Sequence, residues 1–139
     1  MPLQKQEFYE GAALHGLARS GKLDAVRLVP PFFRLNGAVS VLLKYSTRGR
    51  SPWGFTFTAD EQSALVCETA KTKTYIGLIC GADGVTAIDF DAYASIAMPK
   101  LTAIRVSCFR DHGEHYGVRG PDGVLERKIA PSAWQRILG

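Results

Sequence analysis

Residues 39–61, VSVLLKYSTRGRSPWGFTFTADE, constrain the fold of this chain more than any other part of it. They open with an apolar run of strand type, in which alternate residues face opposite sides of a sheet. One side carries Val39, Val41, Leu43 and Tyr45, and the other carries Ala38, Ser40, Leu42 and Lys44. A lysine at the apolar end of a strand loses hydration unless a partner or a ligand meets its charge. The pattern therefore predicts an anionic group close to Lys44.

Turn and cap signals around this strand predict its neighbours. Asn36-Gly37 stands between two apolar runs, and both residues accept positive φ, which predicts an antiparallel hairpin between 31–36 and 38–45. Thr58 followed three residues later by Glu61 is a capping box that starts a helix. Further elements are expected as a helix over 7–19, a short strand over 24–29, the capped helix to about residue 70 and a buried central strand over 74–80.

The rest of the chain has a β-rich pattern. Turns at 81–84, 111–113 and 120–123 separate short apolar runs, and a short helix is expected after Pro131. The sequence thus predicts a single α/β (α+β) domain over 1–139, with a mixed sheet flanked by helices. We expect its core at about 5–81 and a β-rich extension with C-terminal hairpins at 82–139.

Composition narrows the classes of function. Lys and Arg number 17 against 13 Asp and Glu, and the formal net charge of +4 favours phosphate-rich or acidic partners. No apolar run approaches the roughly 18 residues needed to span a bilayer, and the N-terminus lacks the apolar region of a secretory signal. Cys67, Cys80 and Cys108 are odd in number and widely spaced, as is typical of reduced thiols. We therefore expect a cytoplasmic protein without a membrane partner.

The order of a helix with Glu10 on its inward face, antiparallel strands, a strand tipped by Lys44, a helix and a strand resembles the core of the PD-(D/E)xK restriction-endonuclease-like superfamily. The resemblance covers about residues 5–81. In that superfamily a helix glutamate, an acid on the second strand and an acid-x-Lys pair on the third surround Mg²⁺, and the lysine steadies the attacking water. The resemblance implies catalytic roles for Glu10 and Lys44.

The chain departs from that motif where metal ligands belong. Leu42 stands two residues before Lys44 in place of the acid, and Asn36 occupies the hairpin where another acid is expected. Asp24 lies at the start of an earlier strand. Because one carboxylate alone rarely holds magnesium, the sequence favours a catalytically degenerate member without a metal or cofactor. Magnesium is expected only if the chain is an active nuclease.

A basic and aromatic cluster follows Lys44. Arg48 and Arg50 can neutralise phosphates beside Lys44, and Trp53 can stack on an unpaired base, so these four residues form the predicted nucleic-acid-binding set. The alternative interpretation is a solvated loop in which Pro52-Trp53 plugs the edge of the core. Arg105, Arg110, Arg119 and Arg127 extend the basic surface if the C-terminal hairpins present them together.

Two other classes of function remain open at this point. The first is a protein-interaction or regulatory module, including a homo-oligomer, built on exposed aromatic residues of the C-terminal hairpins. The second is an active metal-dependent nuclease that recruits Glu7, Glu10 or Asp24 in an unusual arrangement. The leading hypothesis is a catalytically degenerate domain of restriction-endonuclease-like fold that binds nucleic acid or another phosphate-rich ligand.

Overall fold

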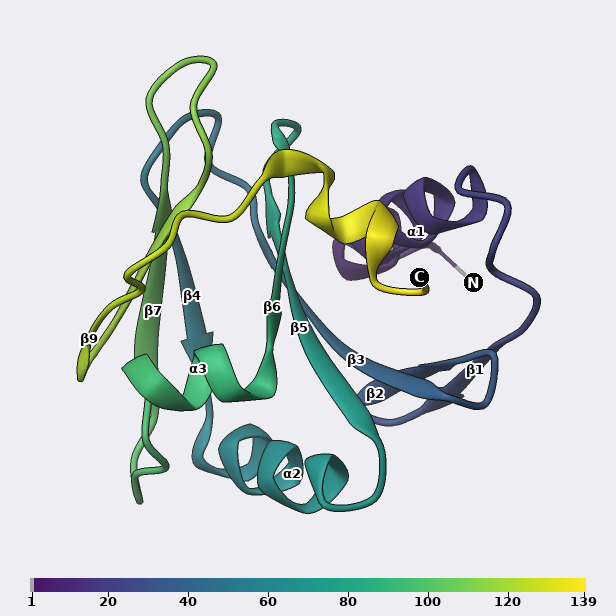
Figure 1. Ribbon diagram of the computed structural model, residues 1–139, viewed down its shortest axis with the longest axis horizontal. Coiled ribbons are helices and arrows are strands. Elements are labelled where there is room, and N and C mark those ends of the chain that lie inside the picture. The colour runs from purple at the N-terminus through teal and green to yellow at the C-terminus, as the bar shows by residue number, and fades with distance from the viewer. Residues whose placement is uncertain (1) are drawn as a thin grey trace.

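The structure, a computed structural model, describes residues 2–139 as an α+β fold with two sheets (Figure 1). Its helices are α1 (Lys5–Ala18), α2 (Ala59–Thr69), α3 (Phe90–Ile96) and the 3-10 helix η1 (Pro131–Arg136). The strands are β1 (Val26–Val29), β2 (Phe32–Leu35), β3 (Val39–Ser46), β4 (Trp53–Phe57), β5 (Lys73–Cys80), β6 (Gly84–Asp89), β7 (Ile104–Phe109), β8 (Gly117–Gly120) and β9 (Gly123–Val124). The α+β class predicted from the sequence is confirmed.

The larger sheet, called sheet A here, has the strand order β1-β2-β3-β5-β6. Its first three strands form an antiparallel meander, and β5 then pairs in parallel with β3. The predicted hairpin is confirmed, because Asn36 and Gly37 have φ of 55° and 66° and β2 pairs antiparallel with β3. The predicted central strand is also confirmed: β5 lies between β3 and β6, and its side chains are buried on both faces.

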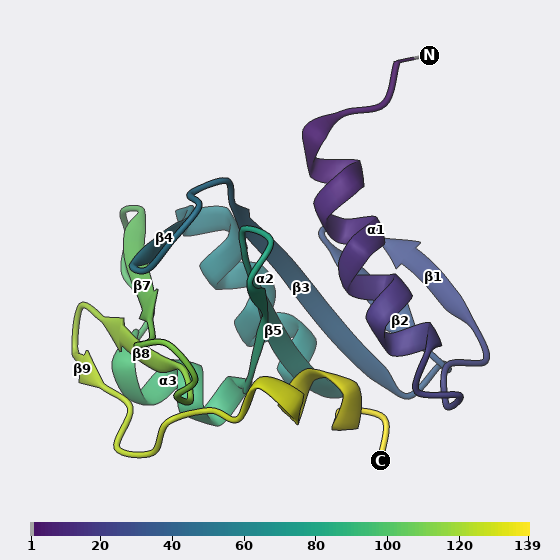
Figure 2. The same ribbon diagram turned by 90° about the horizontal axis from the view of Figure 1, so that it is seen from above.

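The smaller sheet, called sheet B, has the order β4-β7-β8-β9 and is antiparallel throughout. It faces sheet A across the larger of two apolar cores, in which Leu42 and Ile76 of sheet A pack with Phe55 and Val106 of sheet B. Helices α2 and α3 close one end of this core (Figure 1). The second core lies on the opposite face of sheet A and is covered by α1 and η1 (Figure 2).

Both sheets contain strands from each side of residue 81, the expected boundary between the core and the β-rich extension. Strand β4 comes from the first part of the chain and pairs with β7 from the second part. Strand β6 and helix η1 come from the second part: β6 is the last strand of sheet A, and η1 packs on one face of that sheet. The segments 5–81 and 82–139 are therefore interwoven, and the β-rich part is not an appendage to a separate core.

Local signals account for where the helices begin. The hydroxyl of Thr58 accepts a hydrogen bond from the backbone amide of Glu61 at 3.1 Å, and the Glu61 carboxylate accepts one from the backbone amide of Thr58 at 2.9 Å. The predicted capping box is therefore confirmed. Helix α3 begins at Phe90 and is capped by Asp89, whose side chain accepts a hydrogen bond from the amide of Ala92. Within the described residues, no helix is both long enough and apolar enough to cross a membrane.

Candidate functional site

A cleft of about 610 Å³ lies beside the second half of β3. Its walls come from four elements: α1, the β1–β2 turn, β3 and β4, with the first turn of α2 at one end. The lining residues are Gln6, Glu10, Leu28, Pro30, Pro31, Phe33, Leu42, Leu43, Lys44, Tyr45, Gly54, Phe55, Thr56 and Glu61. Both residues that the sequence assigns to a catalytic role, Glu10 and Lys44, line this cleft.

Two free strand edges border the cleft. Strand β2 pairs with β3 only as far as Val41, so residues 42–46 of β3 have no strand partner on that side. Strand β4 pairs with β7 on one side and forms the edge of sheet B on the other. Backbone N–H and C=O groups along such edges remain open to a further partner. The cleft therefore offers polar backbone as well as side chains.

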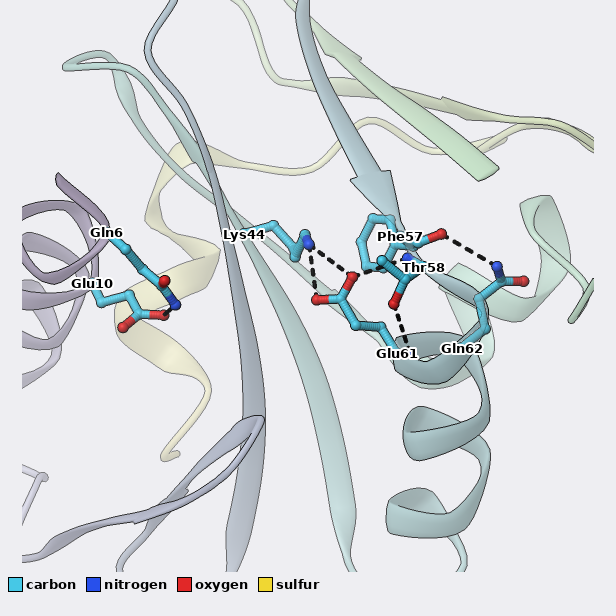
Figure 3. Close-up of polar contacts among 7 residues, drawn as sticks. All are labelled: Gln6, Glu10, Lys44, Phe57, Thr58, Glu61 and Gln62. Carbon is cyan, nitrogen blue, oxygen red and sulfur yellow. Dashed lines mark hydrogen bonds and ion pairs between the residues drawn. The ribbon is translucent and has the colours of Figure 1, made fainter. Parts of the chain in front are cut away.

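The sequence predicts an anionic group near Lys44, and the structure shows that this group is Glu61, in the first turn of α2 (Figure 3). Lys44 Nζ donates to the two Glu61 carboxylate oxygens at 2.9 and 2.8 Å, and both side chains are about one-fifth exposed. The capping box positions this carboxylate, because Glu61 reaches back toward Thr58 at the start of the helix. Lys44 Nζ also lies 5.4 Å from the centre of the Phe57 ring, which supports the cation from β4.

Glu10 approaches the cleft from the other side of β3. Helix α1 packs on the face of sheet A that bears Val41 and Leu43, whereas Lys44 points to the opposite face (Figure 3). Tyr9 stacks on Tyr45 with ring centres 4.9 Å apart, which fixes the position of this helix turn. The Glu10 carboxylate accepts a hydrogen bond from Gln6 at 3.0 Å. Glu10 and Lys44 thus share the cleft, and the ion pair joins Lys44 to Glu61.

The residues of this cleft do not fit the magnesium ion that the resemblance implies. Mg²⁺ requires several oxygen ligands in near-octahedral geometry, whereas the Glu61 carboxylate is already engaged by Lys44 and the Thr58 amide. Leu42 is buried in the larger core at 2% exposure. Within residues 2–139, no three His, Cys, Asp or Glu side chains gather as a metal site would require.

Asp24 and Asn36, the other two residues compared with the metal-binding motif, do not contribute to the cleft. Asn36 acts as a clamp: its Oδ1 accepts the amides of Asp24 and Ala25 at 2.7 and 3.1 Å, and its Nδ2 donates to the Lys22 carbonyl. Asp24 takes part through this backbone amide and is exposed. Asn36 is therefore explained by the turn that it stabilises.

The predicted nucleic-acid-binding set is divided by the structure. Arg48 and Arg50 are exposed on residues 47–52, which connect the two strands that wall the cleft. Trp53 is only 2% exposed, and its Nε1 donates to the Arg48 carbonyl at 2.9 Å. Its indole belongs to the larger core, so it cannot stack on a base. The alternative interpretation, in which this tryptophan plugs the core edge, describes its position.

Sequence patterns alone miss two parts of the site. The pattern around Glu61 indicates only a helix cap, although the cap itself directs the Glu61 carboxylate toward the end of β3. Strand β4 is absent from the expected elements, although Trp53, Phe55 and Phe57 alternate with Gly54 and Thr56 in the pattern of a half-buried strand. That alternation is the available signal for the second wall of the cleft.

The fold and the site together define a two-sheet α+β domain with a polar cleft between two free strand edges. Comparison of the chain with protein-family models, with curated proteins and with solved structures gave no match.

Proposed function

We propose that this chain is a binding domain for nucleic acid or another phosphate-rich ligand. The observation that carries the proposal is the position of Arg48 and Arg50 in the loop that joins the two walls of the cleft. Both side chains are exposed, and neither takes part in an ion pair among residues 2–139. Guanidinium groups of this kind neutralise phosphates and release counterions from a nucleic acid.

The charges inside the cleft support a binding role at its rim. Lys44 is neutralised by Glu61, and Glu10 adds a negative charge on the other side of β3. A phosphate backbone would therefore meet its cations at the loop end of the cleft and not at Lys44. We keep a restriction-endonuclease-like core as our hypothesis for this fold, and Leu42, which stands in place of the acid, supports a catalytically degenerate member.

A second candidate function follows from the two free strand edges. An extended peptide can add to an exposed edge through main-chain hydrogen bonds, and residues 42–46 of β3 and all of β4 offer such edges at the cleft. A protein-interaction role is therefore the alternative to nucleic-acid binding. The two proposals differ in their dependence on salt, since only the first relies on released counterions.

The test measures binding of labelled single- and double-stranded DNA and RNA over a salt series. Under the proposal, affinity falls steeply with salt, and the variant Arg48→Ala/Arg50→Ala lowers the salt slope by about 1 for each phosphate that the loop no longer neutralises. The matched control is Arg19→Ala/Arg136→Ala, which removes the same charge from exposed residues of the α1 and η1 layer. Absence of binding at low salt, or an equal weakening in the control, overturns the proposal.

A further inference from the structure

The outer face of sheet B is open to solvent and carries a distinctive set of side chains. The inward residues of its strands, such as Phe55 and Val106, fill the larger core, so the alternate residues point outward. Strand register places these outward residues opposite one another, at Gly54, Thr56, Arg105, Ser107, Phe109, Gly117, Arg119 and Val124. The set includes two arginines and an aromatic ring, and it includes no carboxylate.

Two glycines allow flat groups to lie against this face. A Cβ atom at Gly54 would collide with the guanidinium of Arg105, so that planar group rests directly on the backbone of β4. A Cβ atom at Gly117 would collide in the same way with the ring of Phe109. Each planar group is held against the backbone on one side. Both planar groups therefore form platforms on the sheet.

Arginine side chains give the surface around the two platforms a positive charge. Arg119 lies over the Phe109 ring, with its Cζ 5.8 Å from the ring centre. Neither Arg105 nor Arg119 forms an ion pair within residues 2–139. By contrast, Arg110 is paired with Asp83 at 3.2 Å and lies against Tyr116 at the end of the sheet. The two free guanidinium groups thus stand on the open face itself.

This face is continuous with the cleft. Gly54 and Thr56 line the cleft at the free edge of β4, and Gly54 also supports the Arg105 guanidinium. The exposed loop with Arg48 and Arg50 leads into the same strand. A ligand that contacts the loop can therefore continue over the edge of β4 onto sheet B.

We infer that the outer face of sheet B binds single-stranded nucleic acid, with one base stacked on the Arg105 guanidinium and another on the Phe109 ring after Arg119 has moved off that ring to meet a phosphate. This inference rests on the proposed function and specifies its ligand and surface. Arg105 and Phe109 are four positions apart along β7, so their Cα atoms are about 13 Å apart, and their planar groups lie over the strands on either side of β7. Stacked bases in a duplex are only about 3.4 Å apart on each strand. Bases on the two platforms must be splayed, and a single strand allows this arrangement.

The test compares binding of a labelled poly-dT oligonucleotide with binding of a duplex of equal length. Phe109→Leu keeps an apolar side chain but removes the ring, and we expect about a 5- to 100-fold weaker affinity for poly-dT with an unchanged salt slope. Arg119→Ala should weaken binding and reduce the salt slope by about 1. Phe8→Leu is the matched control, since Phe8 is a 62% exposed aromatic on α1. Circular dichroism and a urea titration show whether each variant is folded.

The outcomes separate this inference from the broader proposal. If poly-dT binds and Phe109→Leu weakens it while Phe8→Leu does not, the inference holds. If nucleic acid binds but Phe109→Leu and Arg119→Ala behave like the wild type, or if the duplex binds as tightly as poly-dT, the inference is overturned and the proposed function stands. If neither ligand binds at low salt, this inference is overturned, and the proposed function is overturned with it if labelled RNA also fails to bind.

Discussion

Lys44 at the end of β3 and Glu61 in the first turn of α2 form a two-contact ion pair, with Nζ 2.9 and 2.8 Å from the two carboxylate oxygens. Both side chains are about four-fifths buried, so removing the lysine leaves a carboxylate with poor access to water. We expect Lys44→Ala to lower the free energy of unfolding by about 1–3 kcal/mol, as measured by urea denaturation.

The control for this prediction is Lys128→Ala. Lys128 pairs with Glu114 at 3.2 Å, but both side chains are about half exposed. An exposed pair contributes little, so this variant should stay within about 0.5 kcal/mol of the wild type. Equal destabilisation of the two variants would show that burial of the Lys44–Glu61 pair has no energetic weight.

Glu68 makes the free energy of unfolding depend on pH in the acidic range. Burial acts to raise its pKa, but hydrogen bonds from Ser40 at 2.5 Å and Arg34 at 2.9 Å outweigh burial, and the pKa lies below its ordinary value of 4.5. The unfolded chain therefore takes up the proton first as pH falls. The stabilisation by Glu68 is complete above the ordinary pKa and disappears as pH falls through the lower folded pKa.

The measurement is urea unfolding of the wild type and of Glu68→Gln between pH 7 and pH 3. We expect Glu68→Gln to be less stable than the wild type at pH 7, because the neutral amide cannot make the charge-assisted hydrogen bonds to Arg34 and Ser40. The difference should shrink toward pH 3. Parallel curves for the two proteins would contradict this assignment.

The hairpin turn between β2 and β3 should make the stability of the fold sensitive to substitution of Gly37. Its φ of 66° lies in the left-handed region, which β-branched residues avoid. Gly37→Val should lower the free energy of unfolding by more than about 1 kcal/mol. Gly37→Asn should cost much less, because asparagine tolerates this conformation. Thermal unfolding of the two variants measures the difference, and similar melting temperatures would argue against this turn.

Tyr93 has a hydroxyl that is not satisfied within residues 2–139. The side chain is 2% exposed, and its burial, with the nearby charge of Glu61, raises its pKa to about 12. Tyr93→Phe should therefore leave stability unchanged or raise it by up to about 1 kcal/mol. Tyr116→Phe is the contrast, because its hydroxyl donates to Asp83 at 2.5 Å. Chemical denaturation should show reduced stability only in Tyr116→Phe.

Catalysis gives the last prediction. The cleft lacks an acid two residues before Lys44, and Glu61 is held by that lysine, so two-metal hydrolysis has no complete set of ligands there. We expect no cleavage of plasmid, linear or single-stranded substrates by the purified protein with Mg²⁺ or Mn²⁺. Wild-type cleavage that disappears in Glu10→Ala would establish an active nuclease instead.

Much of sheet A could be predicted because its signals are local. The turn at Asn36-Gly37, the capping box at Thr58 and the apolar run of β5 each depend on residues close in sequence. Sheet B could be predicted only in part: the turns at 111–113 and 120–123 correctly indicate the β7–β8 and β8–β9 hairpins, but the place of β4 could not be predicted. Its first strand, β4, pairs with β7, which lies some fifty residues later, and no local turn announces that pairing.

The candidate site could be predicted only in part for the same reason. Strand alternation correctly indicates that Lys44 needs an anionic partner, but it cannot choose between Glu10 and Glu61. That choice depends on which face of sheet A each helix covers: α1 covers one face and α2 the other. Trp53 is ambiguous in the sequence because a loop tryptophan serves equally well as a stacking surface or as part of a core.

The two tryptophans of the chain are divided between its two cores. Trp53 lies in the core between the sheets, and Trp134 lies under α1, where its Nε1 donates to the Ala13 carbonyl at 2.8 Å. Each core thus contains its own intrinsic fluorophore. Replacing either one with phenylalanine leaves a single tryptophan, whose emission can be excited selectively, so unfolding of the two layers can be recorded separately without an added dye. Coincident transitions would mean that both layers melt as one cooperative unit.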